Sequence, residues 1–458
     1  MKKILLVDDD VAVTNHFLVA LTQTERFEPV IVNDSRGVPD LLAGERFDAI
    51  ILDLDMPDVS GVDILKLMRE KDLRTPVVVL TGVGDVDLAV KSMKLGAFDY
   101  LTKPVDDEHL LDVLEEAVAH GALHRSLSEL PAEPKREDLA HAAAFEGFVT
   151  AHPKMIRLLH EAEKMAAGEI TVLIVGERGT AREALAHAMH RVSSRRGGPF
   201  VVADALGDAR DVFPAMLFGQ APGWRDEAEE RQGLLEQAAG GTLFIDHIER
   251  LSLAVQLRLK RVIQTGKYYR ENSTHVMTAE VRLIVASTED LASPQYKGPF
   301  SPDLLYHLTV NTLRVPPLRD RGEDIPLLAD HVMRQESRKT GKRIDACAPE
   351  VLDFLAGYAF PGNDRELESV IAGAVLRCEG ERITMKDLPP CVQEPAGCEG
   401  APAAEEFEPR KLAEIERDYV VRTLKFCDGD KAAAAARLGV TARQLDQILA
   451  EKRKGAPH

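Results

Sequence analysis

The sequence predicts a multidomain α/β protein that ends in a small all-α domain, and three observations lead to this fold class. The first is Ile4–Asp10, where a short apolar run ends abruptly in three carboxylates. The second is Ile170–Val175, another apolar run, which leads into a glycine-containing turn and a helical pattern. The third is a pair of short helical patterns separated by Gly439. With 458 residues, 45% hydrophobic and 29% charged, the chain can build three or four domains.

The first element, Ile4–Val7, is typical of a strand buried on both faces of a parallel sheet. Ligands of such sheets lie outside the carboxyl ends of the strands, so Asp8 and Asp9 are expected at the rim. Two adjacent acids repel each other unless a cation neutralises them, and Mg²⁺ prefers carboxylate and water oxygens. The alternative interpretation is an acidic loop without a metal.

Three further predicted strands deliver polar side chains to the same rim. Ala49–Leu52 ends at Asp53, Pro76–Leu80 ends at Thr81, and Phe98–Thr102 ends at Lys103. A carboxylate, a hydroxyl and an ammonium beside an acidic pair form a site that accepts and holds a phosphoryl group on Asp53. Lys103 pairs with the phosphoryl oxygens as a point charge, and Thr81 can hydrogen-bond to them.

Residues 1–121 therefore resemble the receiver domain of a two-component response regulator, which has a flavodoxin-like fold. The resemblance implies a sensor histidine kinase as partner, Mg²⁺ as cofactor and a cis peptide before Pro104. A flavodoxin-like domain with a coincidental acid cluster is the alternative. Asp8 and Asp9 match the acidic pair of that family, and Asp53 matches its phosphoacceptor. Thr81 matches the switch hydroxyl, Tyr100 the switch aromatic and Lys103 the lysine.

A linker is predicted over residues 122–147. The last receiver helix is expected to run from Glu108 to about Gly121, and Pro131 and Pro134 break any continuous helix after it. A short helix can form again in the alanine-rich part after Glu137. The segment is either a dimer contact, as in related proteins, or a plain tether.

The middle block, residues 148–390, repeats the α/β pattern. Strands are predicted at Ile170–Val175, at Leu243–Ile245, which ends in Asp246, and at Val281–Ser287. The first strand runs into Gly176–Glu183 and then a helix. A glycine-containing turn from a strand to a helix N-terminus is where proteins cradle phosphates.

This block resembles the AAA+ domain of the NtrC class, which uses ATP to remodel sigma-54 RNA polymerase. The resemblance rests on Gly241–Asp246, Gln256–Gln264, Val315–Arg321 and Pro361–Leu367. It implies a large α/β subdomain over 148–315 and a helical lid over 316–390. The residues at its nucleotide-binding positions are Gly176, Gly179, Thr180, Arg182, Asp246 and Arg365.

The chain departs from that family where the chemistry takes place. The family's phosphate loop reads GESGTGKE, whereas here Ala181 replaces the last glycine and Arg182 replaces the lysine that reaches the phosphates. After Asp246 the family has a glutamate that activates water, and here the residue is His247. Thr288 stands at the position of the sensor I asparagine.

The two arginine fingers of the family pattern FREDLYYRL are matched by Ser301 and His307. We therefore predict a degenerate AAA+ domain with no catalytic residues, while residual ATP binding through backbone amides and Arg365 stays open. The alternative is a sigma-54 activator that still hydrolyses ATP. The family's sigma-54 contact loop, GAFTGA, is matched by the charged residues 223–228, in which Trp224 either contacts a partner or packs on its own domain.

Residues 391–408 read as a flexible acidic linker and 409–454 as a helix-turn-helix that resembles the Fis-type domain. Thr441 is a plausible N-cap of the recognition helix, Ala442–Leu449. A charged helical hairpin that binds protein is the alternative. The candidate base readers are Arg443, Gln444 and Gln447, and the candidate phosphate contacts are Lys431, Arg437, Lys452, Arg453 and Lys454.

Charge is distributed unevenly along a chain whose formal net charge is −18. Residues 1–121 carry 24 acids and 12 bases, whereas residues 410–454 carry 11 bases and 7 acids, which suits a phosphate-facing carboxyl end. No apolar run is long enough to span a bilayer, and Asp8–Asp10 cut the apolar start too short for a signal peptide. Five cysteines without metal-ligand spacing are expected as free thiols in the cytoplasm.

Together these patterns predict a cytoplasmic two-component response regulator that is phosphorylated on Asp53 and binds DNA sequence-specifically. The expected partners are the kinase, DNA, RNA polymerase and further copies of the chain, as a dimer or a larger assembly.

Overall fold

The computed structural model describes residues 1–82, 88, 91–93, 95–206, 212–222, 230–293, 295–296 and 298–393, and the single residues 420, 423 and 431. The chain divides into two compact units, Met1–Pro389 and Pro390–His458. Within the described residues, no helix combines the length and the apolar composition that a bilayer span requires.

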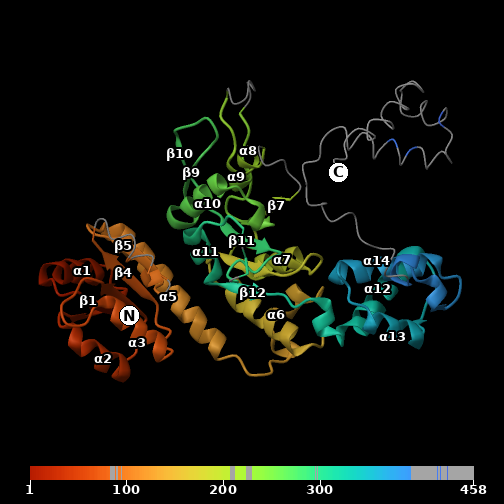
Figure 1. Ribbon diagram of the computed structural model, residues 1–458, viewed down its shortest axis with the longest axis horizontal. Helices are drawn as coiled ribbons and strands as arrows, with labels where there is room; N and C mark the ends of the chain where they lie inside the picture. Colours follow the sequence, from red (N-terminus) through yellow and green to blue (C-terminus); the bar gives the residue numbers. More distant parts are fainter. Residues whose placement is uncertain are drawn as a thin grey trace, which may run out of the picture. The chain divides into compact units, whose positions relative to one another are not determined.

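The first sheet is parallel throughout, with the strand order β2-β1-β3-β4-β5. Figure 1 labels its strands β1, β4 and β5. This arrangement confirms the α/β class expected for the amino-terminal part. The strands are β1 (Lys2–Val7), β2 (Phe27–Val32), β3 (Ala49–Asp53), β4 (Val77–Thr81) and β5 (Asp99–Thr102). The helices between and after them are α1 (Val11–Gln23), η1 (Ser35–Gly37), α2 (Val38–Gly44), α3 (Gly61–Glu70) and α5 (Asp107–Ser128).

Alternation along the strands divides the core of this domain into two layers. Ile4 and Leu6 of β1 pack in the cluster that contains the apolar residues of α1 and α5. Leu5 and Val7 pack in the other cluster, with α2 and α3. Because both faces are covered, β3 and β4 are buried over their whole length and β1 is buried from Ile4 to Val7, and the polar side chains of β3 and β4 are those at their carboxyl ends.

Helix α5 continues to Ser128, beyond the end expected near Gly121. Helix formers, from Ala122 to Ser128, follow without a glycine or proline, so nothing in the chain ends the helix earlier. After it, two short 3-10 helices form, η2 (Arg136–Asp138) and η3 (Ala142–Phe145), where one reformed helix was expected. Phe145 is fully buried in the core of the second domain.

The second sheet is also parallel, with the order β12-β6-β11-β8-β7. Its strands are β6 (Val172–Val175), β7 (Phe200–Asp204), β8 (Thr242–Asp246), β11 (Arg282–Ser287) and β12 (Thr312–Arg314). A separate antiparallel pair is formed by β9 (Lys267–Tyr269) and β10 (Val276–Thr278). The helices are α6 (Pro153–Ala166), α7 (Arg182–Val192), α8 (Phe213–Phe218), α9 (Leu234–Gln237), η4 (Ile248–Arg250), α10 (Leu253–Thr265) and α11 (Pro302–Thr309).

Two clusters again cover the two faces of this sheet. Val172 and Ile174 pack with α6 and α7, whereas Leu173 packs with α8 to α11. The predicted strands therefore form within one or two residues of their expected ends. The carboxyl ends of β6, β7 and β8 meet at one edge, where the glycine-containing loop connects β6 to α7.

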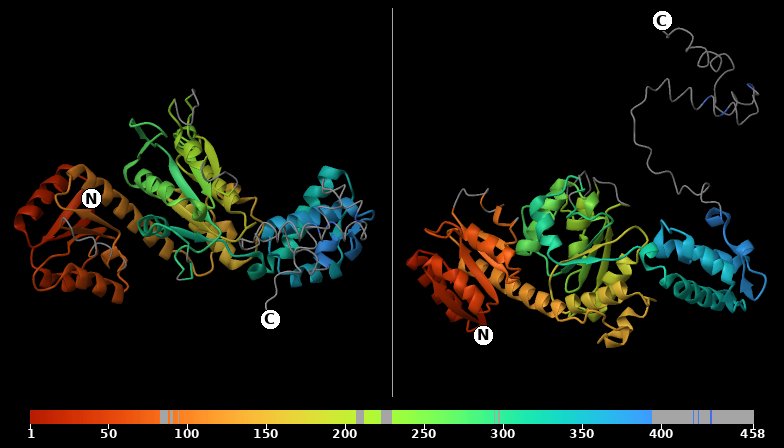
Figure 2. Two further views of the ribbon diagram at one scale, coloured as in Figure 1. Left: turned by 45° about the horizontal axis from the view of Figure 1, so that its top comes forward. Right: turned by 60° about the horizontal axis from the view of Figure 1, so that its bottom comes forward.

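The lid is helical, and α12 and α14 pack side by side in it (Figure 2). Its elements are η5 (Leu318–Arg321), α12 (Asp324–Thr340), β13 (Ala346–Cys347), α13 (Pro349–Gly357), α14 (Asn363–Arg377), β14 (Arg382–Ile383), η6 (Met385–Asp387) and α15 (Pro390–Gln393). Asp324 is fully buried and accepts hydrogen bonds from Thr150 Oγ1 at 2.6 Å, Ala151 N at 2.8 Å and His152 N at 3.2 Å. This carboxylate therefore joins the lid to the segment that enters α6.

Candidate functional site

The first candidate site lies at the carboxyl edge of the first sheet. Asp8 follows β1 and is fully buried, Asp9 beside it is exposed, and Asp53 ends β3. Lys103 Nζ donates to Asp8 Oδ2 at 2.7 Å and lies 3.0 Å from Asp53 Oδ2. The peptide between Lys103 and Pro104 is cis, as expected. The structure thus brings together the four charged residues that the strand ends predicted.

Burial and charge set the protonation of this cluster. Burial raises the pKa of Asp53 above its ordinary value, with Lys103 opposing the shift. Burial disfavours the charge on Lys103, but its hydrogen bonds with Asp8 and Asp53 outweigh that effect and raise its pKa. Lys103 therefore stays positive and holds both carboxylates at the rim. Asp10 has a different task, because its side chain caps α1 by accepting from Ala12 N at 2.8 Å.

These residues fit a divalent cation. Single oxygens of Asp8, Asp9 and Asp53 lie within 4.8 Å of one another, which suits carboxylate ligation of Mg²⁺. Thr81 Oγ1 is buried and has no hydrogen-bond partner among the described residues. A phosphoryl oxygen on Asp53 is a suitable acceptor for that hydroxyl, and Tyr100 lies partly buried on the neighbouring strand.

Helix α3 begins directly against the backbone of Asp53, and this requires a glycine. A Cβ added to Gly61 would lie 2.3 Å from the carbonyl oxygen of Asp53. Ser60 caps the helix by accepting from Asp63 N. The close approach of Gly61 fixes the strand end that carries the candidate phosphoacceptor.

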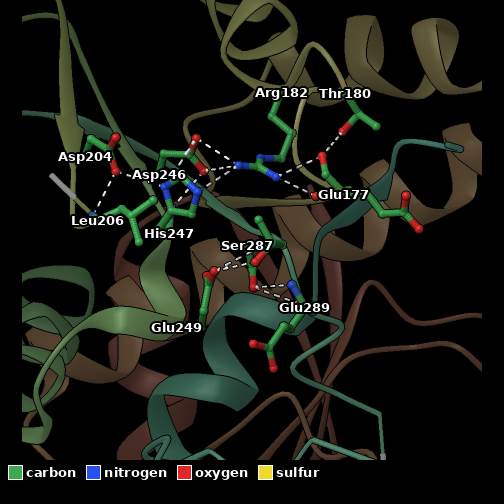
Figure 3. Close-up of polar contacts among 12 residues, drawn as sticks. Glu177, Thr180, Arg182, Asp204, Leu206, Asp246, His247, Glu249, Ser287 and Glu289 are labelled. Carbon is green, nitrogen blue, oxygen red and sulfur yellow. Dashed lines mark hydrogen bonds and ion pairs between the residues drawn. The ribbon is translucent and has the colours of Figure 1, made fainter. Parts of the chain in front are cut away.

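The second candidate site is the loop between β6 and α7, and Arg182 is its central residue (Figure 3). The Arg182 guanidinium donates through Nη1 to the carbonyl oxygens of Gly176 at 2.5 Å and Glu177 at 3.1 Å. Through Nη2 it donates to both oxygens of Asp246, at 2.9 and 3.0 Å. The Arg182 residue is only 6% exposed. The arginine is therefore folded into the loop and paired with the carboxylate that ends β8.

His247, which follows Asp246, is held between two charged groups. Its Nδ1 lies 2.9 Å from Asp204 Oδ1 and its Nε2 lies 3.4 Å from Arg182 Nη2. Since arginine can only donate, Nε2 can face Arg182 only as an acceptor, and Nδ1 can donate to Asp204. The backbone of His247 is left-handed, with φ of 56°, a conformation that costs a non-glycine residue energy. Asp204 is the partner that orients the ring.

The remaining catalytic positions of the resemblance are engaged in structural contacts. Thr288 donates its hydroxyl hydrogen to Glu249 Oε1 at 2.6 Å. Ser301 is buried, and its backbone N–H donates to Gln256 Oε1 at 2.8 Å at the start of α11. His307 Nε2 lies 3.0 Å from Gln264 Nε2, and burial lowers its pKa, so the imidazole is neutral at pH 7. No arginine charge is reproduced at the last two positions.

The lid contacts the loop directly. Glu177 forms two hydrogen bonds with Arg319, of 2.5 and 2.7 Å, and Asn363 Nδ2 donates to the carbonyl oxygen of Arg178 at 3.0 Å. Gly179 has φ of 82°, and an added Cβ would lie 2.1 Å from Gly362 O. Thr180 donates its hydroxyl hydrogen to Glu177 O at 2.7 Å. The loop conformation is thus set by protein contacts on both sides.

Mg²⁺ does not fit at this second site as the residues stand. The carboxylate at the end of β8 is the metal ligand that phosphate-loop ATPases use, and both oxygens of Asp246 already accept from Arg182. A guanidinium does not lose its proton in proteins, so it does not leave the carboxylate by deprotonation.

The stem of the predicted sigma-54 contact loop is held by arginines. Gln220 forms isolated β-bridges through its backbone with Arg231 and Glu271. The Arg258 guanidinium lies 3.8 Å from the centre of the Phe218 ring. Arg270 pairs with Glu236 at 2.6 Å. Residues 223–229, including Trp224, lie outside the described residues, so the two interpretations of Trp224 stay predictions.

Most of the predicted DNA-contacting residues also lie outside the part of the chain that the structure describes. Lys431 is described and is exposed on a helix. The others, which are not described, are Arg437, Thr441, Arg443, Gln444, Gln447, Lys452, Arg453 and Lys454.

Three acids near the second site were missed in the sequence, namely Asp204, Glu249 and Glu177. Asp204 follows the run Phe200–Ala203 and could have been found, because it ends a strand just as Asp246 does. Glu249 and Glu177 carry no such signal, because only the fold brings them to Thr288 and Arg319.

Comparison with known families matches almost the whole chain. The response regulator receiver domain matches residues 4–115 and the sigma-54 interaction domain matches 148–314. The AAA+ ATPase lid domain matches 319–404, and the Fis family of bacterial regulatory proteins matches 411–450. The first of these families implies a histidine kinase as partner, the second RNA polymerase with sigma-54, and the last DNA.

Individual proteins are similar over nearly their full length. The transcriptional regulatory protein ZraR of Klebsiella oxytoca is 35% identical over 444 residues, which cover 96% of this chain and 97% of that protein. The regulatory protein AtoC of Escherichia coli (strain K12) is 32% identical, with 98% of each chain covered. A structure of NtrX from Brucella abortus in complex with ATP covers 98% of this chain and 99% of that one, with a TM-score of 0.50 and 25% identity. The chain belongs to the NtrC family of response regulators, with a receiver, a sigma-54 interaction domain of AAA+ fold, a lid and a Fis-type helix-turn-helix.

Proposed function

We propose that this NtrC-family regulator receives a phosphoryl group from a sensor histidine kinase on Asp53 and regulates transcription without hydrolysing ATP. The observation that carries the proposal is the pairing of Arg182 with both oxygens of Asp246. It occupies the carboxylate on which metal-assisted hydrolysis in this fold depends. The AAA+ domain then serves assembly, and sigma-54 polymerase is not activated.

ATP hydrolysis in this fold has three requirements, and the described residues meet none of them in the usual form. The phosphates need a lysine clamp, whereas Arg182 is bound to loop carbonyls and Asp246. The water needs a carboxylate base, whereas His247 has its Nε2 directed at Arg182. The developing charge needs an arginine from a neighbouring subunit, and its loss lowers the rate by roughly 10³–10⁵.

At the receiver, the positions of the side chains support a separate role for each residue. Asp8, Asp9 and Asp53 hold Mg²⁺, which offsets the charge of the incoming phosphoryl group. Lys103 then pairs with a phosphoryl oxygen, and Thr81 donates its hydroxyl hydrogen to another. Movement of Thr81 toward the phosphoryl group leaves space into which Tyr100 can turn, which carries the signal to the surface of β5.

Output is assigned to residues 409–454, which bind DNA as a dimer. Helix-turn-helix dimers read inverted half-sites about one helical turn apart. Arg443, Gln444 and Gln447 read bases, whereas Lys431, Arg437 and Arg453 contact phosphates. Thr441 caps the recognition helix.

Arg443→Ala should cost about 1–3 kcal/mol and relax one base position, whereas Arg453→Ala should weaken binding to all sequences alike. An equal loss on specific and random DNA from Arg443→Ala would remove it from the base readers.

ATP turnover by the full-length protein tests the proposal. Purified protein, untreated or phosphorylated with acetyl phosphate, should show no turnover above that of an Asp246→Ala control at any protein concentration. Arg182→Lys or His247→Glu alone should not restore turnover, because residues that act as a unit are not additive. Turnover that rises on phosphorylation and disappears in Asp246→Ala contradicts the proposal.

The second candidate function is a sigma-54 activator that hydrolyses ATP. The match of residues 148–314 to the sigma-54 interaction domain, with the strand, loop and lid all present, favours it. Open-complex formation with sigma-54 polymerase in the presence of ATP would establish this second function instead.

A further inference from the structure

We propose that the lid carries a second DNA-contacting surface, which binds the phosphate backbone beside the site held by the helix-turn-helix and reads no bases. The surface is the exposed face of α12 together with the turn that follows it. The inference goes beyond the proposed function and rests on it only in that residues 409–454 bind DNA. The residues of this surface, called the α12 patch, are all exposed and are His331, Arg334, Arg338, Lys339 and Arg343.

Positive charge is concentrated at this place in an acidic chain. Residues 330–343 carry five bases and two acids, whereas the whole chain carries 57 bases and 75 acids. A local excess of positive charge attracts anions to that part of a surface. Double-stranded DNA carries one negative charge per about 1.7 Å of its axis, so it can meet several of these side chains at once. A polyanion therefore complements the α12 patch better than a small anion does.

The charges of the α12 patch are held on one face of a helix. His331, Arg334, Arg338 and Lys339 line one groove of about 650 Å³ along α12. Positions 331, 334 and 338 are three and four residues apart, which is the spacing of neighbours on a helix surface. Val332 is buried on the other side of the helix and keeps α12 from turning these side chains away. The patch is therefore a fixed surface.

These charges are also available to phosphate groups. Arg338 and Arg343 have no hydrogen bond or ion pair among the described residues. Arg334 and Lys339 pair with acids of the same helix, at 2.9 and 2.7 Å, and their side chains are 64% and 60% exposed. Exposed pairs of this kind contribute only about 0–1 kcal/mol, so a phosphate can replace the acid at little cost. Lys342 is not part of the patch, because its Nζ donates to three backbone carbonyl oxygens at the end of α14.

The order of the domains along the chain favours contact with the same duplex. The lid is followed by the linker predicted over 391–408, which has 18 residues, and then by the helix-turn-helix. A flexible chain of this length spans about 23 Å on average. Phosphates beside the helix-turn-helix site are then presented to the lid at a high effective concentration, so a few contacts are enough to change the affinity.

Salt-dependent binding of labelled random-sequence DNA to the full-length protein tests the inference. The double variant Arg338→Gln with Lys339→Gln keeps the helix and removes two charges. On a duplex of about 40 base pairs it should lower the slope of log association constant against log salt concentration by about 1.8, because each phosphate contact contributes about 0.9. On a duplex of about 20 base pairs, which the two half-sites of the helix-turn-helix fill, it should bind as the wild type does.

Two controls separate contact from a general effect of charge. Arg191→Gln with Arg196→Gln removes two exposed arginines of the large subdomain and should leave both slopes unchanged. An unchanged slope of the α12 variant on the long duplex, or an equal change in this control, overturns the inference. Arg453→Ala should weaken binding to both duplexes whether or not the α12 patch contacts DNA. Absence of wild-type binding to either duplex contradicts the proposed DNA-binding output, and the inference with it.

Discussion

The two candidate sites of this chain face the same electrostatic problem and solve it differently. Each has acidic side chains at the ends of parallel strands, and each neutralises them with a basic side chain of the chain itself. In the receiver the base is Lys103, whose side chain is 28% exposed and forms one contact with each of two carboxylates. In the AAA+ domain it is Arg182, which is 6% exposed and makes four short hydrogen bonds.

The difference shows what a site needs in order to admit a metal ion. A lysine is a point charge on a flexible stem, so it can move from a carboxylate to a phosphoryl oxygen while Asp9 stays open to solvent. A guanidinium is a planar fork. Here one terminal nitrogen donates to two backbone carbonyl oxygens of the loop and the other donates to the Asp246 carboxylate. We therefore expect the receiver site to admit a divalent cation and the AAA+ site to retain the guanidinium of Arg182 instead.

The largest expected effect is on phosphorylation. Asp53→Asn removes the only carboxylate that ends β3, so labelling by acetyl phosphate should fall below detection. Asp112→Asn, an exposed acid on α5, should label as the wild type does. Radiolabel or mass measurement of the intact protein gives the result. If Asp53→Asn were labelled as strongly as the wild type, Asp53 would not be the phosphoacceptor.

Replacement of Arg182 should give the next largest effect. Arg182→Ala leaves Asp246 partly buried without its partner, which should lower the stability of the AAA+ domain by about 1–3 kcal/mol. Arg191→Ala on the same helix should change it by less than about 0.5 kcal/mol. Urea unfolding followed by circular dichroism measures both. Equal effects of the two variants would show that Arg182 contributes nothing beyond an ordinary surface arginine.

Mg²⁺ should distinguish the two sites, because it should change the thermal unfolding of only one of the two domains. At ten times the dissociation constant, a ligand that binds only the folded state adds about 1.4 kcal/mol. Mg²⁺ without nucleotide should therefore raise the unfolding temperature of the receiver and leave that of the AAA+ domain unchanged. Differential scanning calorimetry with and without EDTA makes the comparison. A rise of the AAA+ transition would show that Asp246 is available to a metal after all.

The smallest expected effect concerns pH. Because burial raises the folded-state pKa of Asp53 above 3.8, the folded receiver holds this proton more tightly than the unfolded chain does. Stability of the metal-free receiver is therefore lost as pH rises through that folded pKa, and ionised Asp53 is unfavourable at pH 7. In EDTA, Asp53→Asn should be slightly more stable than the wild type at pH 7 and not below pH 3.8. Asp112→Asn should show no such dependence, and the same gain at both pH values would contradict the assignment.

Sequence reasoning reached the receiver site because Asp8, Asp53 and Thr81 end or follow apolar runs typical of buried strands, whereas Lys103 follows a strand of which only Leu101 is buried. Because the carboxyl ends of parallel strands lie at the same edge of a sheet, the positions of Asp8, Asp53, Thr81 and Lys103 after their strands predict one shared rim. The same rule applied to β7 would have found Asp204. The end of α5 was wrong by seven residues, since no residue there stops a helix.

The pairing of Arg182 with Asp246 could not be predicted in this way. The sequence shows an arginine where a lysine is usual, but the rotamer that turns it into the loop depends on carbonyl oxygens that only the folded loop presents. Contacts between the loop and the lid, such as Glu177 with Arg319, join residues 142 positions apart and have no periodic signal.

Buried Asp324 fastens the chain entering α6 to the first turn of α12 through three hydrogen bonds. Thr150 and its neighbours lie shortly after the linker, so the end of the linker is attached to the lid as well as to the large subdomain. In mechanical terms, this carboxylate is the point at which the lid is attached to the chain that enters α6. We therefore expect that a displacement of the linker would reach the lid through this one carboxylate, by a route that does not pass through the loop between β6 and α7.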